Sequence, residues 1–113
     1  MANQGAKRKP TGSIYILQWE DGVIKVGKSH TPHTRVGMHL DERKDVAMQA
    51  HWISPSFPGY WEAETHLIQW AKSQAATWNS RPGVRLRLAD KPREWFVGLS
   101  FEEAVVKGTS QAW

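Results

Sequence analysis

One residue of this 113-residue sequence that could do chemistry is a glutamate on an apolar helix face. Residues 60–76 have helical periodicity, and one narrow arc at 100° per residue holds Tyr60, Ala63, Leu67, Trp70 and Ala71. Glu64 falls inside this arc, whereas Glu62, His66 and Gln69 fall outside it. An interior carboxylate is costly unless it is paired, hydrogen-bonded or bound to a metal. Glu64 is therefore either the partner of a basic side chain at the edge of the arc or a candidate metal ligand.

Histidines are the second group that invites a metal hypothesis. The five histidines include His30 and His33 at the start of a predicted helix, and His51 in a predicted strand. Glu62 and His66 are four residues apart and would share one helix face. The sequence has no His-Glu-x-x-His zinc motif, and a Glu/His pair at this spacing is more typical of a solvated face. The pattern therefore gives zinc little support.

Several kinds of catalytic site are excluded by what the sequence lacks. With no cysteine there is no disulfide framework, no cysteine zinc site and no thiol nucleophile. There is no glycine-rich phosphate loop of the Walker or dinucleotide type. There is also no Gly-x-Ser-x-Gly nucleophile elbow for a serine hydrolase.

One constellation in the first forty residues is more specific. Gly12-Ser13-Ile14-Tyr15 is followed by Lys25-Val26-Gly27, then by Arg35 eight positions after Gly27, and by His39 four positions later. This order and spacing resemble the GIY-YIG nuclease superfamily. In that family an N-terminal hairpin carries the two motifs, and the first helix carries an arginine and often a histidine one turn later.

The second half of the chain agrees with this resemblance. Glu64-Thr65-His66-Leu67-Ile68 looks like the Glu-x-x-Leu-Ile of the family's long helix, and Trp78-Asn79 looks like the aromatic-Asn pair that ends that segment. Glu94-Trp95-Phe96 is similar to the close of the domain in a phage and bacterial branch of the family. The resemblance covers about residues 12–100.

The resemblance implies a divalent-metal-dependent endonuclease that hydrolyses phosphodiester bonds of nucleic acid, with DNA as the expected substrate. Glu64 would be the metal ligand for Mg²⁺ or Mn²⁺, because hard cations take carboxylate and phosphate oxygens. The metal would polarise the scissile phosphate and stabilise the departing 3′ oxygen. Asn79 would position Glu64 or its surroundings.

The remaining roles implied by the resemblance concern phosphate binding and proton transfer. Arg35 offers a planar fork of donors to phosphate oxygens as negative charge builds up. Tyr15 is the candidate general base, and since free tyrosine has a pKa near 10 it needs help from a cation or a metal-bound water. His39 would hold the phosphate or relay the proton.

Two positions depart from the family pattern. Ser13 replaces the first glycine of the first motif, and Lys25 stands where the second motif has its tyrosine. On the paired strand, Lys25 could favour the phenolate form of Tyr15. The alternatives left open are a nucleic-acid-binding module that no longer cuts, a restriction-type or repair nuclease acting as a dimer, and a frame in which Glu62 with His66 replaces Glu64.

The elements that must position these residues form an α+β domain. Strands are predicted over 13–19 and 23–28 around an Asp21-Gly22 turn, and over 49–53. Helices are predicted from Thr31-Pro32 to about Asp41 or beyond, over 60–76, and after Ser100, which opens a capping box. Residues 84–88 and 93–97 are candidate short strands. We therefore expect a three-stranded antiparallel sheet in a β-β-α-β-α core, with a basic tail over 1–11, one domain over 12–107 and a tail over 108–113.

Charge favours a nucleic-acid partner. Fifteen Lys and Arg against eleven Asp and Glu give a net charge of +4. The cations expected to contact nucleic acid are Lys7, Arg8, Lys9, Lys28, Arg35, Arg81, Arg85 and Arg87. Specificity would come from the tail, from the segment over 80–93, from a homodimer or from a partner recognition domain. Without a signal peptide or a long apolar stretch, the sequence predicts a cytoplasmic protein, and the resemblance implies that it is bacterial or phage-encoded.

Overall fold

A five-stranded sheet with helices on both faces is the framework of the protein. The computed structural model describes residues 10–77 and 95–111. The hairpin strands are β1 (Ser13–Trp19) and β2 (Val23–Ser29), and the remaining strands are β3 (Met48–Ile53), β4 (Ala76–Thr77) and β5 (Trp95–Val97). Their order is β3-β1-β2-β5-β4, and every neighbouring pair is antiparallel. The α+β class is confirmed, but the expectation of three strands is wrong.

The two additional strands explain that difference. β4 has two residues and β5 has three, so neither is long enough to show a period of its own. β5 pairs with β2 although more than 60 positions separate them in the sequence, and β4 pairs with β5. β5 falls within the candidate strand over 93–97 and confirms it for residues 95–97, whereas β4 was not predicted. Their pairing depends on hydrogen-bonding groups at the edge of a distant hairpin, which local sequence does not reveal.

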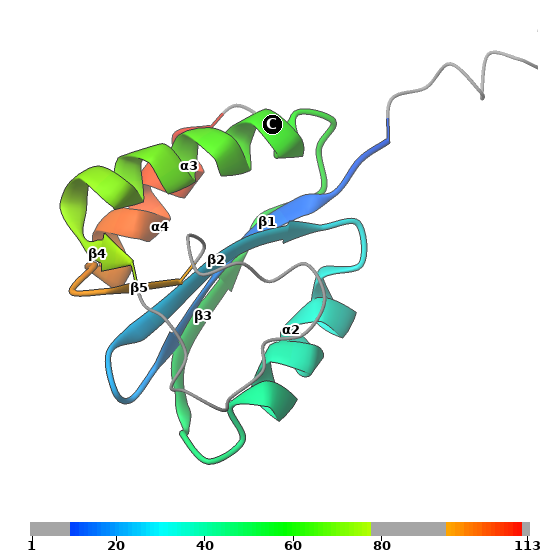
Figure 1. Cartoon of the computed structure of the whole chain (residues 1–113). Coiled ribbons are helices and arrows are strands. Elements are labelled where there is room, and N and C mark those ends of the chain that lie inside the picture. The colour runs from blue at the N-terminus through cyan, green and yellow to red at the C-terminus, as the bar shows by residue number, and fades with distance from the viewer. Residues whose placement is uncertain (1–9, 78–94, 112–113) are drawn as a thin grey trace, which may run out of the picture.

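The helices divide between the two faces of the sheet. Figure 1 shows α2 (Pro32–Glu42) on one face, and α3 (Tyr60–Gln74) and α4 (Phe101–Thr109) together on the other. Alternate residues of β1 supply both cores. Ile14 and Ile16 pack in the cluster with α3 and α4, whereas Tyr15, Leu17 and Trp19 pack on the α2 side.

The helix starts follow the predicted residues, with one difference in capping. Ser100 Oγ accepts a hydrogen bond from the Glu103 N–H at 3.2 Å, which confirms the cap of α4. Thr31 makes no side-chain cap for α2, contrary to expectation, and its own N–H donates to Ser29 Oγ at 2.9 Å. α3 ends at Gln74 rather than residue 76, because the backbone at Ala75 is extended and leads into β4.

The end of α2 is tied to the β1–β2 turn. The Arg43 guanidinium donates to both carboxylate oxygens of Asp21 and lies over the Trp19 ring, 5.0 Å from its centroid. These hydrogen bonds hold the pKa of Asp21 below its usual value. The contact fixes the last turn of α2 against the sheet. In the parts of the chain that the structure describes, no helix is long and apolar enough to cross a membrane.

Candidate active site

A buried chain of three polar side chains links the sheet to α2. The Tyr15 hydroxyl lies 2.9 Å from His39 Nε2, and His39 Nδ1 lies 3.1 Å from Glu42 Oε1. Tyr15 is 2% exposed and His39 is fully buried. Of the two roles expected for His39, proton relay fits this placement, because its Nε2 contacts the Tyr15 hydroxyl.

Gly27 makes room for the tyrosine. Tyr15 and Gly27 are direct partners in the register of β1 and β2. A Cβ atom at Gly27 would lie 2.4 Å from both the ring carbon Cζ and the hydroxyl oxygen of Tyr15. The aromatic ring therefore lies across the glycine of the neighbouring strand. This contact gives a physical reason for the spacing between the two sequence motifs.

Lys25 lies on the same face of the sheet as Tyr15. Leu17 is its direct partner on β1, so Lys25 is diagonal to Tyr15 in the register. The side chain is fully buried, with Nζ 5.3 Å from the centroid of Trp95. Trp95 also meets the His39 ring edge-on at 5.6 Å. Lys25 is thus placed to act on the Tyr15–His39 pair, and its burial argues against direct contact with a phosphate.

Glu64 lies on the opposite face of the sheet, where the apolar arc of α3 placed it. It is 5% exposed, whereas Glu62 is exposed. Lys28 Nζ lies 3.0 Å from Glu64 Oε1, so the basic partner comes from β2. The same ammonium lies 4.1 Å from the ring centroid of Trp61, a side chain that is 59% exposed. Burial favours Glu64 over Glu62 as the carboxylate of the site.

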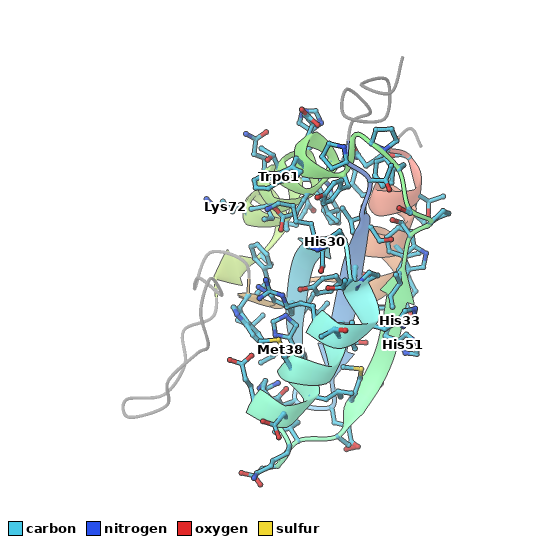
Figure 2. All side chains as sticks on the ribbon, turned by 90° about the vertical axis from the view of Figure 1, so that its right-hand side faces the viewer. His30, His33, Met38, His51, Trp61 and Lys72 are labelled. Carbon is cyan, nitrogen blue, oxygen red and sulfur yellow. The ribbon has the colours of Figure 1, made fainter. Side chains whose placement is uncertain are left out.

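A pocket of about 410 Å³ lies where the start of α2 and the start of α3 meet the end of β2. Figure 2 shows Trp61, His30 and Met38 on this side of the molecule. The residues that line the pocket are Lys28, Ser29, His30, Thr31, Thr34, Arg35, Met38, Tyr60 and Trp61. Its side chains combine cations with aromatic surface, which suits an anion that carries a planar ring.

Arg35 relates this pocket to the buried chain. It lines the pocket and stands four residues before His39, so the two residues lie along one face of α2. The structure therefore brings Tyr15, Lys25 and His39 together on the α2 side, and Lys28 and Glu64 together on the α3 side. Arg35 lines the pocket together with Lys28 of the second group.

Other predicted residues lie elsewhere. His33, His51 and His66 are exposed on three different elements, and the described ranges contain no group of three or more His, Asp or Glu that could hold a metal. Several predicted site residues lie outside the described residues: Asn79, the arginines Arg81, Arg85 and Arg87, and the basic residues Lys7, Arg8 and Lys9 of the tail. The candidate strand over 84–88 also lies outside them.

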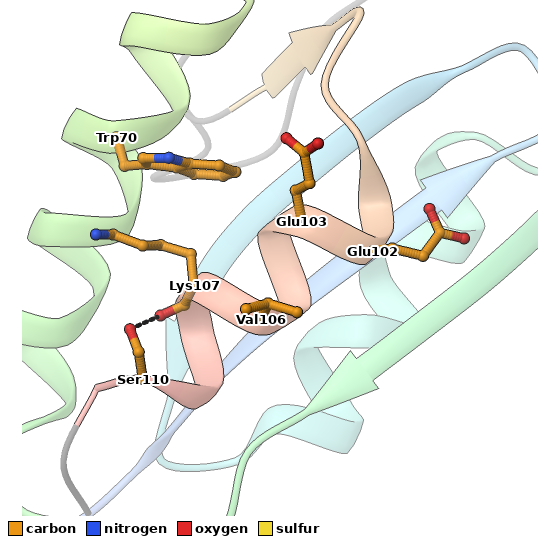
Figure 3. Close-up of a pocket in the computed structure, with 6 residues that line it drawn as sticks. All are labelled: Trp70, Glu102, Glu103, Val106, Lys107 and Ser110. Atoms are coloured by element: carbon orange, nitrogen blue, oxygen red, sulfur yellow. Dashed lines mark hydrogen bonds between the residues drawn. The ribbon is translucent and has the colours of Figure 1, made fainter.

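A second pocket, of about 450 Å³, lies between α3 and α4 (Figure 3). Its lining residues are Trp70, Glu102, Glu103, Val106, Lys107 and Ser110. None of them is a predicted site residue, and two of its carboxylates would repel an anionic substrate. The first pocket is therefore the better candidate.

Glu42 belongs to the buried Tyr15–His39 chain and was not among the residues predicted from the sequence. Its side chain is 4% exposed, although it lies in the last turn of a helix whose other polar residues mostly face solvent. The available signal was the spacing of three between His39 and Glu42, which places both on one helix face. That signal is weak, since charged residues at this spacing are common on solvated helices.

Comparisons with known proteins found no relative of this chain. No protein-family model matches the sequence, and no curated protein and no solved structure matches it.

Proposed function

We propose that the protein is a metal-dependent endonuclease of the GIY-YIG type that hydrolyses phosphodiester bonds in nucleic acid, most readily DNA. The observation that carries the proposal is the buried 2.9 Å hydrogen bond between the Tyr15 hydroxyl and His39 Nε2. It supplies the help that a tyrosine needs to act as a base near neutral pH. The motif resemblance and the cationic pocket beside Arg35 support the same function.

Proton transfer begins in the buried pair. His39 Nε2 takes the Tyr15 hydroxyl proton, and the resulting phenolate takes a proton from the attacking water. The water oxygen bonds to phosphorus while the bond to the leaving oxygen breaks. Arg35 and Lys28 neutralise the charge that builds up on the phosphate oxygens.

Glu64 fits the role of metal ligand. Mg²⁺ is often held by one or two carboxylates and completes its shell with water and substrate phosphate, so one buried carboxylate paired with the pocket residue Lys28 is a sufficient protein anchor. Bound there, the metal would supply Lewis-acid stabilisation of phosphate charge. Lys28, which now pairs with Glu64, would turn toward phosphate when a cation takes the carboxylate.

The direct test is cleavage of supercoiled plasmid with Mg²⁺ and with EDTA. We expect nicked and linear products that depend on Mg²⁺ and disappear with EDTA. Binding without cleavage at any pH would instead support a nucleic-acid-binding module that has lost the reaction. Full burial of Lys25 counts against a binding module in which this lysine grips a phosphate.

Lys25→Met tests whether the lysine assists Tyr15. An ammonium near a phenol favours the phenolate, so its loss is expected to move the alkaline rise in cleavage rate to higher pH. The measurement is a pH–rate profile of the wild type and the variant. Lys25→Arg, which keeps the charge, serves as the control. A profile that does not move with Lys25→Met would remove the lysine from the proton-transfer step.

Trp61→Ala tests whether the pocket takes an unpaired base. Trp61 is exposed beside Lys28, and base stacking on an aromatic ring contributes about 1–3 kcal/mol. We expect this loss in affinity for a single-stranded oligonucleotide in EDTA, with a smaller change for Trp61→Phe. Val106→Ala, at an exposed site on α4, is the control. Equal affinity of Trp61→Ala and wild type would exclude stacking at this residue.

A further inference from the structure

We propose that Glu42 is a positioning residue that holds His39 in the tautomer with its proton on Nδ1. Nε2 is then free of hydrogen and accepts the Tyr15 hydroxyl proton. The catalytic consequence rests on the proposed nuclease function, whereas the tautomer is a property of the folded protein and can be tested without cleavage.

The direction of the hydrogen bonds follows from the chemistry of the three groups. An ionised carboxylate only accepts hydrogen bonds, so the His39 nitrogen that faces Glu42 must carry the hydrogen. In neutral imidazole the other nitrogen is then an acceptor. That nitrogen is Nε2, which lies 2.9 Å from the Tyr15 oxygen, so the hydroxyl donates to it. A neutral amide at position 42 could donate as well as accept and would not impose this order.

Burial makes the carboxylate effective. The His39 side chain is fully buried and that of Glu42 is 4% exposed, so water does not substitute for either partner. When His39 takes the Tyr15 proton, an imidazolium forms between a phenolate and a carboxylate. Glu42 stabilises this cation, as the carboxylate of a Ser-His-Asp triad does for its histidine.

Two basic residues lie on the same side of the sheet as the pair. Lys25 faces it from β2, next to the Trp95 ring of β5, and Arg35 stands one helical turn before His39 on α2. Both are hydrogen-bond donors without an acceptor, so neither selects the Nδ1–H tautomer as a carboxylate does. Glu42 is the acidic group shown in contact with His39.

Arg43, the residue after Glu42, anchors the end of α2. The Arg43 N–H donates to the His39 carbonyl oxygen at 3.1 Å, and the Arg43 side chain is bound to Asp21 of the β1–β2 turn. The last turn of α2 is therefore fastened to the same hairpin that carries Tyr15. This arrangement holds the helix turn that carries the carboxylate and the imidazole against the hairpin that carries the phenol.

The test is long-range ¹H–¹⁵N NMR of protein labelled with ¹⁵N in its histidine side chains, which reports the hydrogen on each ring nitrogen. His39→Gln assigns the signal. We expect neutral His39 in the wild type to carry hydrogen on Nδ1 alone, and Glu42→Gln to show both the Nδ1–H and the Nε2–H forms, because the amide can donate as well as accept. Asp41→Asn, one residue away and exposed, should leave the His39 signal unchanged. Hydrogen on Nε2 in the wild type, or an unchanged tautomer in Glu42→Gln, would overturn the proposal.

Cleavage supplies the second readout. Glu42→Gln is expected to lower the rate about 10–100-fold, the loss that removal of a histidine's outer hydrogen-bond partner causes in metal sites. Glu42→Asp should restore part of the rate. If the wild type has the Nδ1–H form but does not cleave, the proposed function fails and the tautomer assignment stands. If Glu42→Gln does not fold, the wild-type tautomer still decides.

Discussion

Glu64→Gln is expected to abolish Mg²⁺-dependent cleavage, with a loss of about 10³-fold or more, while binding of nucleic acid persists. A metal supplies several kcal/mol of charge stabilisation in the transition state, and each 1.36 kcal/mol is a factor of ten in rate. The amide keeps the shape of the side chain but is a poor ligand for a hard cation. It also frees Lys28 from its 3.0 Å ion pair, so affinity for phosphate should hold or rise.

Glu62→Gln is the matched control, two residues away on the same helix and exposed. It should cleave like the wild type. The measurements are single-turnover cleavage of a labelled duplex and, in EDTA, binding of the same duplex. Loss of activity in Glu62→Gln with retention in Glu64→Gln would show that the other carboxylate of α3 holds the metal. Full activity of both variants would exclude metal binding on this helix.

The parts of the fold that sequence predicts well are those whose reason is local. The hairpin depends on an Asp-Gly turn in which Gly22 adopts φ 87°, and its strands alternate between two cores. α3 shows its buried face in its own periodicity, which is how Glu64 could be placed in the interior before any partner was known. The capping box of α4 is likewise a property of four consecutive residues.

The parts that sequence does not predict depend on contacts between distant segments. β5 reaches its place because Ile24 and Lys25 offer it a free strand edge, and nothing in residues 95–97 alone specifies that neighbour. The partner of Glu64 is Lys28 rather than an arginine, because β2 passes beneath α3. Lys25 and Glu42 look like surface charges in the sequence and become buried only when α2 packs on one face of the hairpin and β5 adds the Trp95 side chain to that face.

Gly27→Ala is expected to damage both stability and cleavage, because the second motif's glycine is the surface on which Tyr15 rests. The added methyl group would lie 2.4 Å from the Tyr15 oxygen and must displace the ring. Overpacking of this kind costs about 1–3 kcal/mol in the free energy of unfolding. Displacement of the ring also breaks the hydrogen bond to His39, so cleavage should fall to the level of Tyr15→Phe even where the variant is folded.

Two comparisons assign the effect to this contact. Gly37→Ala, in the exposed middle of α2 with open space around it, should stabilise the protein by about 0.5–1 kcal/mol through helix propensity. In a Tyr15→Ala background the Gly27→Ala change should cost far less than in the wild type, since the ring it would strike is gone. Urea unfolding of the four members of this double-mutant cycle gives the coupling energy. A coupling energy near zero would mean that Gly27→Ala destabilises the strand itself and not the packing of Tyr15. The spacing between the two motifs would then need another physical reason.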